Sequence, residues 1–335
     1  MTDSTDKVSF YPLSPSKVLP AVFGALNFLL LLTHIFLSFI RYKWNHFGFM
    51  ISWACIVWIA GFVCREVSVF YKDNLSLYIA QYILILAGPV VYAAAEYFIL
   101  GRLLAYLPYH TPINPGRVLS TFLLLSGAVE GLTAGGASTL ANSADEGKSD
   151  LRNSGLNLIK AALILQLVVE GSFLSMVVMV ERRCRKAGHF IARIRTVCYV
   201  LYVTSSMVLV RCIFRAVQGF QEAACPIDNP SCSVTDHAEW FLWVFEVANI
   251  TVFSLILVLF PPGRYLPRDP KIYLDPVDGQ TERIGPGFSK AMRRNFFATV
   301  VDPFDCVGMI RRKNREEQVD KYWEKENPVA AVKQT

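Results

Sequence analysis

The sequence predicts an all-α, polytopic membrane protein: a bundle of seven transmembrane helices with its N-terminus outside the cytosol and its C-terminus inside. Hydrophobic residues make up 53% of the 335 residues and only 18% are charged, against about 25% in a typical soluble domain. The apolar residues form blocks of about 18–25 residues, the length that crosses a hydrocarbon core of about 30 Å. Basic residues are concentrated in one loop between these blocks and in the segment that follows them.

Each apolar block is predicted to be a helix, because backbone polar groups inside lipid must hydrogen-bond within their own segment. Residues 1–17 are too short to fold alone and are expected to form a short extracytoplasmic N-terminus. The first block is too long for the core of a signal peptide and no small-residue cleavage site follows it, so it is taken as the first span. The seven predicted spans of this membrane domain, residues 18–260, are 18–40, 47–64, 75–100, 118–141, 154–180, 196–218 and 239–260.

The orientation follows from Lys and Arg, which are enriched in cytosolic loops. The loop between the fifth and sixth spans carries six basic residues, whereas residues 219–237, between the sixth and seventh, carry none. This difference places the 5–6 loop in the cytosol. Residues 261–335 contain fourteen basic and eleven acidic residues, a balance that predicts a cytosolic, largely unpacked tail.

Two cysteines lie in the loop that is predicted to be outside. Cys225 and Cys232 bracket the segment Pro-Ile-Asp-Asn-Pro-Ser, and disulfides persist in oxidising compartments. We expect these two cysteines to be joined. The alternative is a pair of free thiols.

Ionisable side chains inside the predicted spans are candidates for function, because charges are costly in a bilayer and usually mark a polar path or site. The orientation places three cations and one acid at the level of the outer leaflet: Lys160, Arg211, Arg215 and Glu246. The other ionisable residues inside the spans are Glu96, Glu130 and Glu170.

Arg211 and Arg215 are four residues apart and therefore share one face of the sixth span. Glu246, on the seventh span, is the expected partner of one of them. The other arginine is then available for a phosphate or carboxylate of a ligand, which a planar guanidinium binds well. The alternative is a structural Arg–Glu pair that locks two helices, with Arg215 reaching to the outer interface.

Glu130 lies mid-span in a run of small residues from Ser126 to Gly136, a pattern typical of close helix packing. A mid-membrane carboxyl group is also suited to carry a proton or to face an amine. Gln166 and Glu170, four residues apart, form a second polar face at mid-depth. All three polar residues are candidates for substrate binding or translocation, together with Lys160 and the Arg–Glu cluster.

No other chemistry is indicated. Only His34 of the five histidines lies inside a span, which argues against the ligand set of a membrane zinc hydrolase. Gly147-Lys148-Ser149 follows a predicted membrane helix and not a strand, so it does not indicate a phosphate-binding loop. We expect no cofactor, no metal, no catalytic residue and no nucleic-acid partner.

Short motifs at the ends of several spans resemble those of the fungal RTA-like proteins, the lipid-translocating exporter family. The similarity covers most of the membrane region, about residues 11–267, and is most specific around the sixth and seventh spans. The motifs are Gly61-Phe62 with Arg65; Gly88-Pro89 with Ala93, Ala94, Tyr97 and Gly101-Arg102; Gln166; Arg211-Cys212-Ile213-Phe214-Arg215; Glu239; and Pro261-Pro262-Gly263. The chain departs from the family at Ile59-Ala60 and at Gln218, where the family usually has Glu.

The resemblance implies a membrane translocator or exporter of an amphiphilic lipid, such as a sphingoid long-chain base, with a contribution to toxicant resistance. The outer basic cluster and the mid-membrane acids would give a headgroup a polar path while its tail stays in lipid. The alternative is a seven-helix receptor or sensor for an amphiphile, which signals to a cytosolic partner through the 5–6 loop and tail. Either protein is expected in the plasma membrane, with an internal membrane as the alternative, and neither is an enzyme.

A membrane-impermeant thiol reagent applied to intact cells tests the orientation. It should label a Ser233→Cys variant, in the 6–7 loop, and should not label an Arg185→Cys variant, because the basic 5–6 loop is retained in the cytosol. The native cysteines provide the background reaction. Labelling at position 185 before the cells are permeabilised would reverse the orientation.

Overall fold

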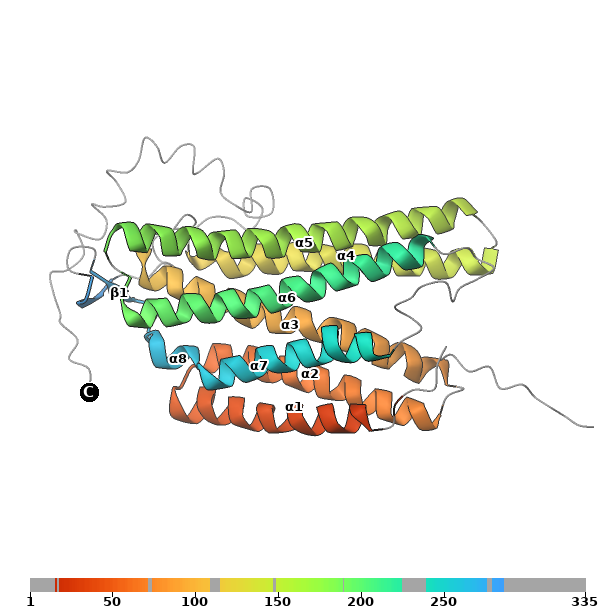
Figure 1. The fold of residues 1–335 in the computed structure, drawn as a ribbon, viewed down its shortest axis with the longest axis horizontal. Helices are drawn as coiled ribbons and strands as arrows, with labels where there is room; N and C mark the ends of the chain where they lie inside the picture. The colour runs from red at the N-terminus through yellow and green to blue at the C-terminus, as the bar shows by residue number, and fades with distance from the viewer. Residues whose placement is uncertain are drawn as a thin grey trace, which may run out of the picture.

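The computed structural model of the protein describes residues 16, 18–71, 74–108, 115–146, 149–188, 190–224, 239–275 and 279–285. Within this part of the chain, seven long helices run along a common axis and form an elongated bundle (Figure 1). All seven are long and apolar enough to cross a membrane. The predicted all-α, seven-span class is therefore confirmed, whereas the orientation of the two ends stays a prediction.

The first and last spans each contain a π-helical segment, written η, in which the backbone hydrogen bonds reach one residue further than in an α-helix. In chain order the elements are α1 (Leu19–Ile35), η1 (Phe36–Arg41), α2 (Asn45–Phe70), α3 (Leu75–Tyr106), α4 (Pro115–Glu146), α5 (Ser149–Lys186), α6 (Ala192–Ala224), η4 (Leu242–Ala248), α7 (Asn249–Leu259), α8 (Pro262–Tyr265), β1 (Ile272–Leu274) and β2 (Glu282–Ile284). The predicted second span ended before Arg65, yet α2 continues to Phe70, because the charge of Arg65 is buried against an acid.

α3 and α6 form the middle of the bundle. α3 packs against α2, α4 and α6, and α6 packs against α3, α5 and α7. The helices α1, α2 and α7 lie on one side of this pair, and α4 and α5 lie on the other (Figure 1). We refer to the end at which α1, α3 and α5 begin as the N-side end, and to the opposite end, where α8 and β1 lie, as the hairpin end.

Polar side chains buried between α1 and α7 hydrogen-bond to each other. Asn27 donates to Thr251 at 3.1 Å, and the side chains of His34 and Ser254 are 3.0 Å apart. Such bonds between helices satisfy polar groups that would be costly in an apolar interior. His34, the histidine inside a predicted span, therefore has a structural partner and fixes how α1 faces α7.

α4 and α5 approach closely where two glycines face each other. A Cβ atom at Gly136 would lie 2.9 Å from the carbonyl oxygen of Gly155 and 2.7 Å from Cγ1 of Ile159. This is the close backbone approach that small residues permit. At Gly127 and Gly131, earlier in the same run, a Cβ would meet nothing within 4 Å, so the run packs tightly only near its C-terminal end.

The chain folds back after α7 and packs against the hairpin end of the bundle. α8 is a single turn, and β1 and β2 form an antiparallel hairpin in which Tyr273 pairs with Arg283. Arg102, near the end of α3, donates to the carbonyl oxygens of Pro267 and Arg268 at 2.8 and 2.6 Å. These contacts hold the segment between α8 and β1 on the bundle.

The prediction of a largely unpacked tail is therefore wrong for residues 261–275 and 279–285. Leu274 is 3% exposed, and Glu282 accepts a hydrogen bond from Tyr106 of α3 at 3.1 Å. Overall polarity did not reveal that the helix ends offer partners for this short segment. The rest of the predicted tail lies outside the described residues.

The glycine contact between α4 and α5 can be tested by adding one methyl group. Gly136→Ala should lower the free energy of unfolding by about 1–3 kcal/mol, the usual cost of forcing extra atoms into a packed contact. The measurement is the melting temperature of the purified protein in detergent. Gly131→Ala is the matched control on the same helix and should melt at or above the wild-type temperature, because Ala favours helix over Gly. Equal melting of the two variants would contradict a tight contact at Gly136.

Candidate functional site

An ion pair joins α6 to η4 inside the bundle. The Arg211 guanidinium donates to Glu246 Oε1 at 2.7 Å, with 2% and 1% of the two side chains exposed. Arg215, one turn further along α6, has Nη1 3.8 Å from Glu246 Oε2 and also donates to Gln218 at 3.1 Å. One carboxylate thus faces both arginines that the sequence placed on one face of the helix.

A small cavity lies at mid-depth between α3, α4, α5 and α6, next to this ion pair. The volume open to the centre of a water molecule is about 20 Å³, which is room for about one water. Four of the predicted candidates, on three different helices, line it. The lining residues are Pro89, Val90, Ala93, Tyr97, Ser126, Val129, Glu130, Gln166, Val169, Glu170, Val208 and Arg211.

Tyr97 connects three walls of the cavity. Its hydroxyl donates to Glu170 Oε1 at 2.7 Å and lies 3.4 Å from the hydroxyl of Ser126. The contact therefore links α3 to α5 and α4. In the sequence, Tyr97 is marked only by the family motif, because a tyrosine in an apolar span is more often a packing residue.

Two irregular stretches of helix border this centre. Pro89 lies inside α3 and lines the cavity; proline has no N–H to donate to the preceding turn of the helix. Glu246 lies in the π-helical segment η4, and such segments occur frequently at functional sites. Asn249, directly after η4, donates to the carbonyl oxygen of Met207 at 2.7 Å and so fastens η4 to α6.

Glu96, adjacent in the chain to Tyr97, is bound by α6. Thr204 and Ser205 donate to its Oε1 at 2.7 and 2.6 Å. Glu96 is 0% exposed, and its charge interacts with that of Glu170. The sequence marked Glu96 as an ionisable residue inside a span but gave no partner for it, because its donors come from a helix about a hundred residues away.

Lys160 lies apart from this centre. Its Nζ is 5.8 Å from the centroid of the Phe220 ring, and Phe220 lines a separate apolar groove between α5 and α6 with Leu167 and Val217. Lys160 is six residues from Gln166, which turns it about 120° around the helix axis. Lys160 and the two arginines have a similar predicted depth in the membrane. They are nevertheless not neighbours, because Lys160 lies on another face of its helix. Cys225 and Cys232, the predicted disulfide, lie outside the described residues.

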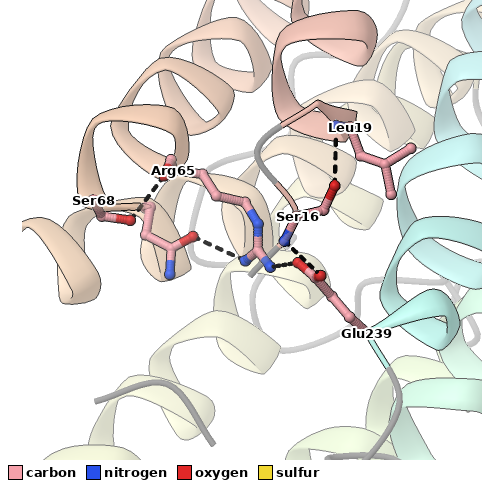
Figure 2. A network of polar contacts seen from close by, with 6 residues as sticks. Ser16, Leu19, Arg65, Ser68 and Glu239 are labelled. Atoms are coloured by element: carbon pink, nitrogen blue, oxygen red, sulfur yellow. Dashed lines mark hydrogen bonds and ion pairs between the residues drawn. The ribbon is translucent and has the colours of Figure 1, made fainter. Parts of the chain in front are cut away.

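A second polar network closes the N-side end of the bundle (Figure 2). Arg65 Nη2 of α2 lies 2.5 Å from Glu239 Oε1, and Arg65 Nη1 donates to Gln81 of α3 at 3.1 Å. The other oxygen of Glu239 accepts the backbone N–H of Ser16 at 2.9 Å. The Arg65 guanidinium also lies 5.3 Å from the ring centroid of Trp243. The network joins α2, α3, Ser16, which lies three residues before α1, and the start of the last span.

Removing one member of the buried ion pair tests its contribution to stability. Arg211→Gln should lower the free energy of unfolding by roughly 3–5 kcal/mol, because it leaves a buried carboxylate without its partner. Thermal unfolding in detergent and the level at the cell surface measure this loss. Arg211→Gln combined with Glu246→Gln should recover much of it, since neither member of the pair then remains as a buried ion without its partner. A double variant as unstable as the single variant would contradict this account.

Comparison with known proteins shows what the chain is similar to. It is 33% identical over 64% of its length to the lipid-translocating exporter-like protein RTA1 of Leptosphaeria maculans, and 28% identical over 72% of its length to the protein of the same name from Ajellomyces capsulatus. The first match spans 42% of the length of the Leptosphaeria relative, and the second spans 76% of the Ajellomyces relative. The chain is also 27% identical, over 63% of its length and 66% of the relative, to protoporphyrin uptake protein 1 of Saccharomyces cerevisiae. No solved structure matches.

The family model described as RTA1 like protein matches residues 51–269. This range runs from within α2 past α8, and it contains the cavity, the Arg211–Glu246 pair and the Arg65–Glu239 pair. The match covers well over half of the chain. The chain therefore belongs to the RTA1-like family of multi-pass membrane proteins.

Proposed function

We propose that this chain translocates an amphiphilic lipid across a membrane. The observation that carries the proposal is a polar centre within an apolar bundle: Glu130, Glu170 and Arg211 meet at a cavity at mid-depth. Ionisable groups at this depth are costly in hydrocarbon and are retained mainly where they serve a path or a site. A polar headgroup that crosses the bilayer needs such partners there.

The acids of this centre suit a cationic headgroup. Glu130 is half-buried, and Glu170 Oε2 is buried with no hydrogen-bond partner among the described residues. A sphingoid long-chain base carries an ammonium group and hydroxyls, which are donors that carboxylates accept in strong, charge-assisted hydrogen bonds. We therefore propose such a base as the substrate, and export of toxic amphiphiles as a contribution to resistance. Two relatives named for lipid translocation and one named for protoporphyrin uptake support an amphiphilic cargo.

The exterior of the bundle gives the tail a route that stays in lipid. α4 is the least buried of the seven spans, and Glu130 lies on it beside the cavity, where the charges of Arg211 and Arg215 act on it. A headgroup could approach Glu130 from the side of α4 while its chain remains among the bilayer chains. The apolar groove at Phe220, between α5 and α6, offers further surface for a chain.

The cavity is too small for a headgroup as it stands. Its volume of about 20 Å³ accommodates one water, so the helices that line it must separate for a lipid to pass. The contacts at the two ends, around Arg65 and around Glu282, would then open in turn. In this scheme the protein is a transporter of the plasma membrane and not an enzyme.

A receptor is the second candidate, and one contact favours it. Glu282 of the hairpin lies 3.5 Å from Arg193 at the start of α6, the helix that carries Arg211. A ligand that moved α6 would therefore also move the hairpin, which could recruit a cytosolic partner. A receptor would bind the amphiphile without moving it across the membrane.

Purified protein in lipid vesicles separates these functions. The wild type should move a fluorescent sphingoid base across the bilayer faster than protein-free vesicles do. The Arg211→Gln/Glu246→Gln double variant should be at least about tenfold slower, because one hydrogen bond to a charged group contributes about 1.5–3 kcal/mol and 1.4 kcal/mol is a factor of ten.

Asp150→Asn is the matched control. Asp150 is an exposed carboxylate at the start of α5, and its variant should keep the wild-type rate. A normal rate in the double variant would exclude a role of the ion pair in headgroup passage. Binding of the base without movement would favour the receptor, and a wild-type rate equal to that of protein-free vesicles would exclude translocation.

A further inference from the structure

Among the described residues, acidic groups outnumber basic groups at the centre of the bundle. The acids there are Glu96, Glu130, Glu170 and Glu246, and the cations whose charges act on them are Arg211 and Arg215. If all these groups were ionised, the centre would carry two net negative charges. Uncompensated charge in a low-dielectric interior is so costly that a group neutralises instead.

Ion pairs and burial distinguish the four acids. Glu246 receives the Arg211 guanidinium at 2.7 Å and has Arg215 at 3.8 Å. Glu130 is half-buried and has the charges of both arginines acting on it. Glu246 thus has both arginines beside it and Glu130 is partly exposed, so Glu96 and Glu170 are the fully buried acids with no ion pair among the described residues.

Glu96 is bound by neutral donors alone. The hydroxyls of Thr204 and Ser205 donate to Oε1, whereas Oε2 is buried with no hydrogen-bond partner among the described residues. Glu96 has no ion pair to a cation within that part of the chain, and the charge that acts on it is that of another acid, Glu170. Complete burial with no cation beside it disfavours the carboxylate form of Glu96, and the two hydroxyl donors offset only part of that cost.

Glu170 is in a similar position at the wall of the cavity. The Tyr97 hydroxyl donates to Oε1 at 2.7 Å, and Oε2 has no hydrogen-bond partner among the described residues. The charge of Arg211 acts on Glu170, but this guanidinium is bonded to Glu246. Unlike Glu96, Glu170 lines a cavity with room for about one water, which could accept or deliver a proton.

We infer that Glu96 and Glu170 are proton-binding sites and that lipid passage exchanges a proton for the headgroup. The second half of this inference rests on the proposed function. A cationic ammonium that reaches the cavity brings one positive charge. Glu170 then releases one proton to water, its O–H bond breaks, and the resulting carboxylate accepts the ammonium, so the net charge of the centre is unchanged. The lipid base and the proton would therefore move in opposite directions.

Other titratable and charged groups face this pair from each element packed around it, and they limit which acid can exchange. They are Tyr97 from α3, Glu130 from α4, Arg211 and Cys212 from α6, and Glu246 from η4. Of the carboxyl groups among them, Glu246 is held by the arginines, and Glu130 is partly exposed. Glu170 is therefore the buried acid that exchanges its proton for the headgroup, and Glu96 is the second proton-binding site next to it.

Infrared spectroscopy of the purified protein tests the proton sites without any transport. At neutral pH the wild type should show the carbonyl stretching band of protonated carboxyl groups, and Glu96→Gln and Glu170→Gln should each remove part of it. Glutamine keeps the carbonyl acceptor for the hydroxyl donors, so both variants should fold. Asp150→Asn is the matched control and should leave the band unchanged. A band that neither variant reduces would overturn the assignment.

The exchange is tested in vesicles with a pH gradient and a pH dye inside. A fluorescent sphingoid base should accumulate on the acidic side, with proton release to the other side, faster than the passive distribution of the amine in protein-free vesicles; Glu170→Gln should abolish this protein-dependent effect of the gradient. Movement of the base with no effect of the gradient would overturn the exchange and leave translocation standing. No movement at any pH would overturn translocation itself, while the infrared result still decides the proton sites.

Discussion

A charge buried in an apolar bundle cannot lose its partner without a large cost, and the Arg211–Glu246 pair places this constraint at the centre of the molecule. The pair joins α6 to η4, with almost no exposure of either side chain. Breaking it would leave one ion without compensation, a loss far larger than that of a surface ion pair. α6 and η4 must therefore move together, or a passing group must replace one of the two partners while they separate. This is a demanding condition, and an amphiphile with a charged headgroup can meet it.

The two ends of the bundle are held by contacts of different kinds. At the N-side end, the Arg65 guanidinium contacts an acid, an amide and an aromatic ring from separate elements. Loss of the Arg65–Glu239 contact would therefore weaken the attachment of several elements at once. At the hairpin end, the contacts are shared among Arg102, Tyr106 and Arg193. Between these closed ends lies a cavity with room for about one water. Under the proposed function, this arrangement would be a closed, occluded form of the transporter.

Hydropathy and charge were sufficient to predict the seven spans, because lipid requires long apolar helices and this pattern is local in the sequence. The i,i+4 spacing likewise placed Arg211 and Arg215 on one face. Contacts between distant segments were not accessible in this way: Arg65 and Glu239 are 174 positions apart, and no spacing rule relates them. Two further features depend on which helices become neighbours. One is the rotation about the α5 axis that separates Lys160 from the arginines, and the other is the packing of the segment after α7 against the bundle.

A proton and an ammonium headgroup can each compensate the excess of negative charge at the centre, but they need different amounts of space. The closed cavity is large enough for a water and a proton but not for a headgroup with its chain. Protonation of the buried acids therefore stabilises the closed form, in which the headgroup is absent, whereas the carboxylate form requires a cation and hence an opening between the helices. The same electrostatic requirement that keeps Arg211 with Glu246 thus links the shape of the bundle to the charge of its centre. A substrate without a positive charge would not satisfy this requirement, which is the physical reason to prefer an amine over a neutral lipid.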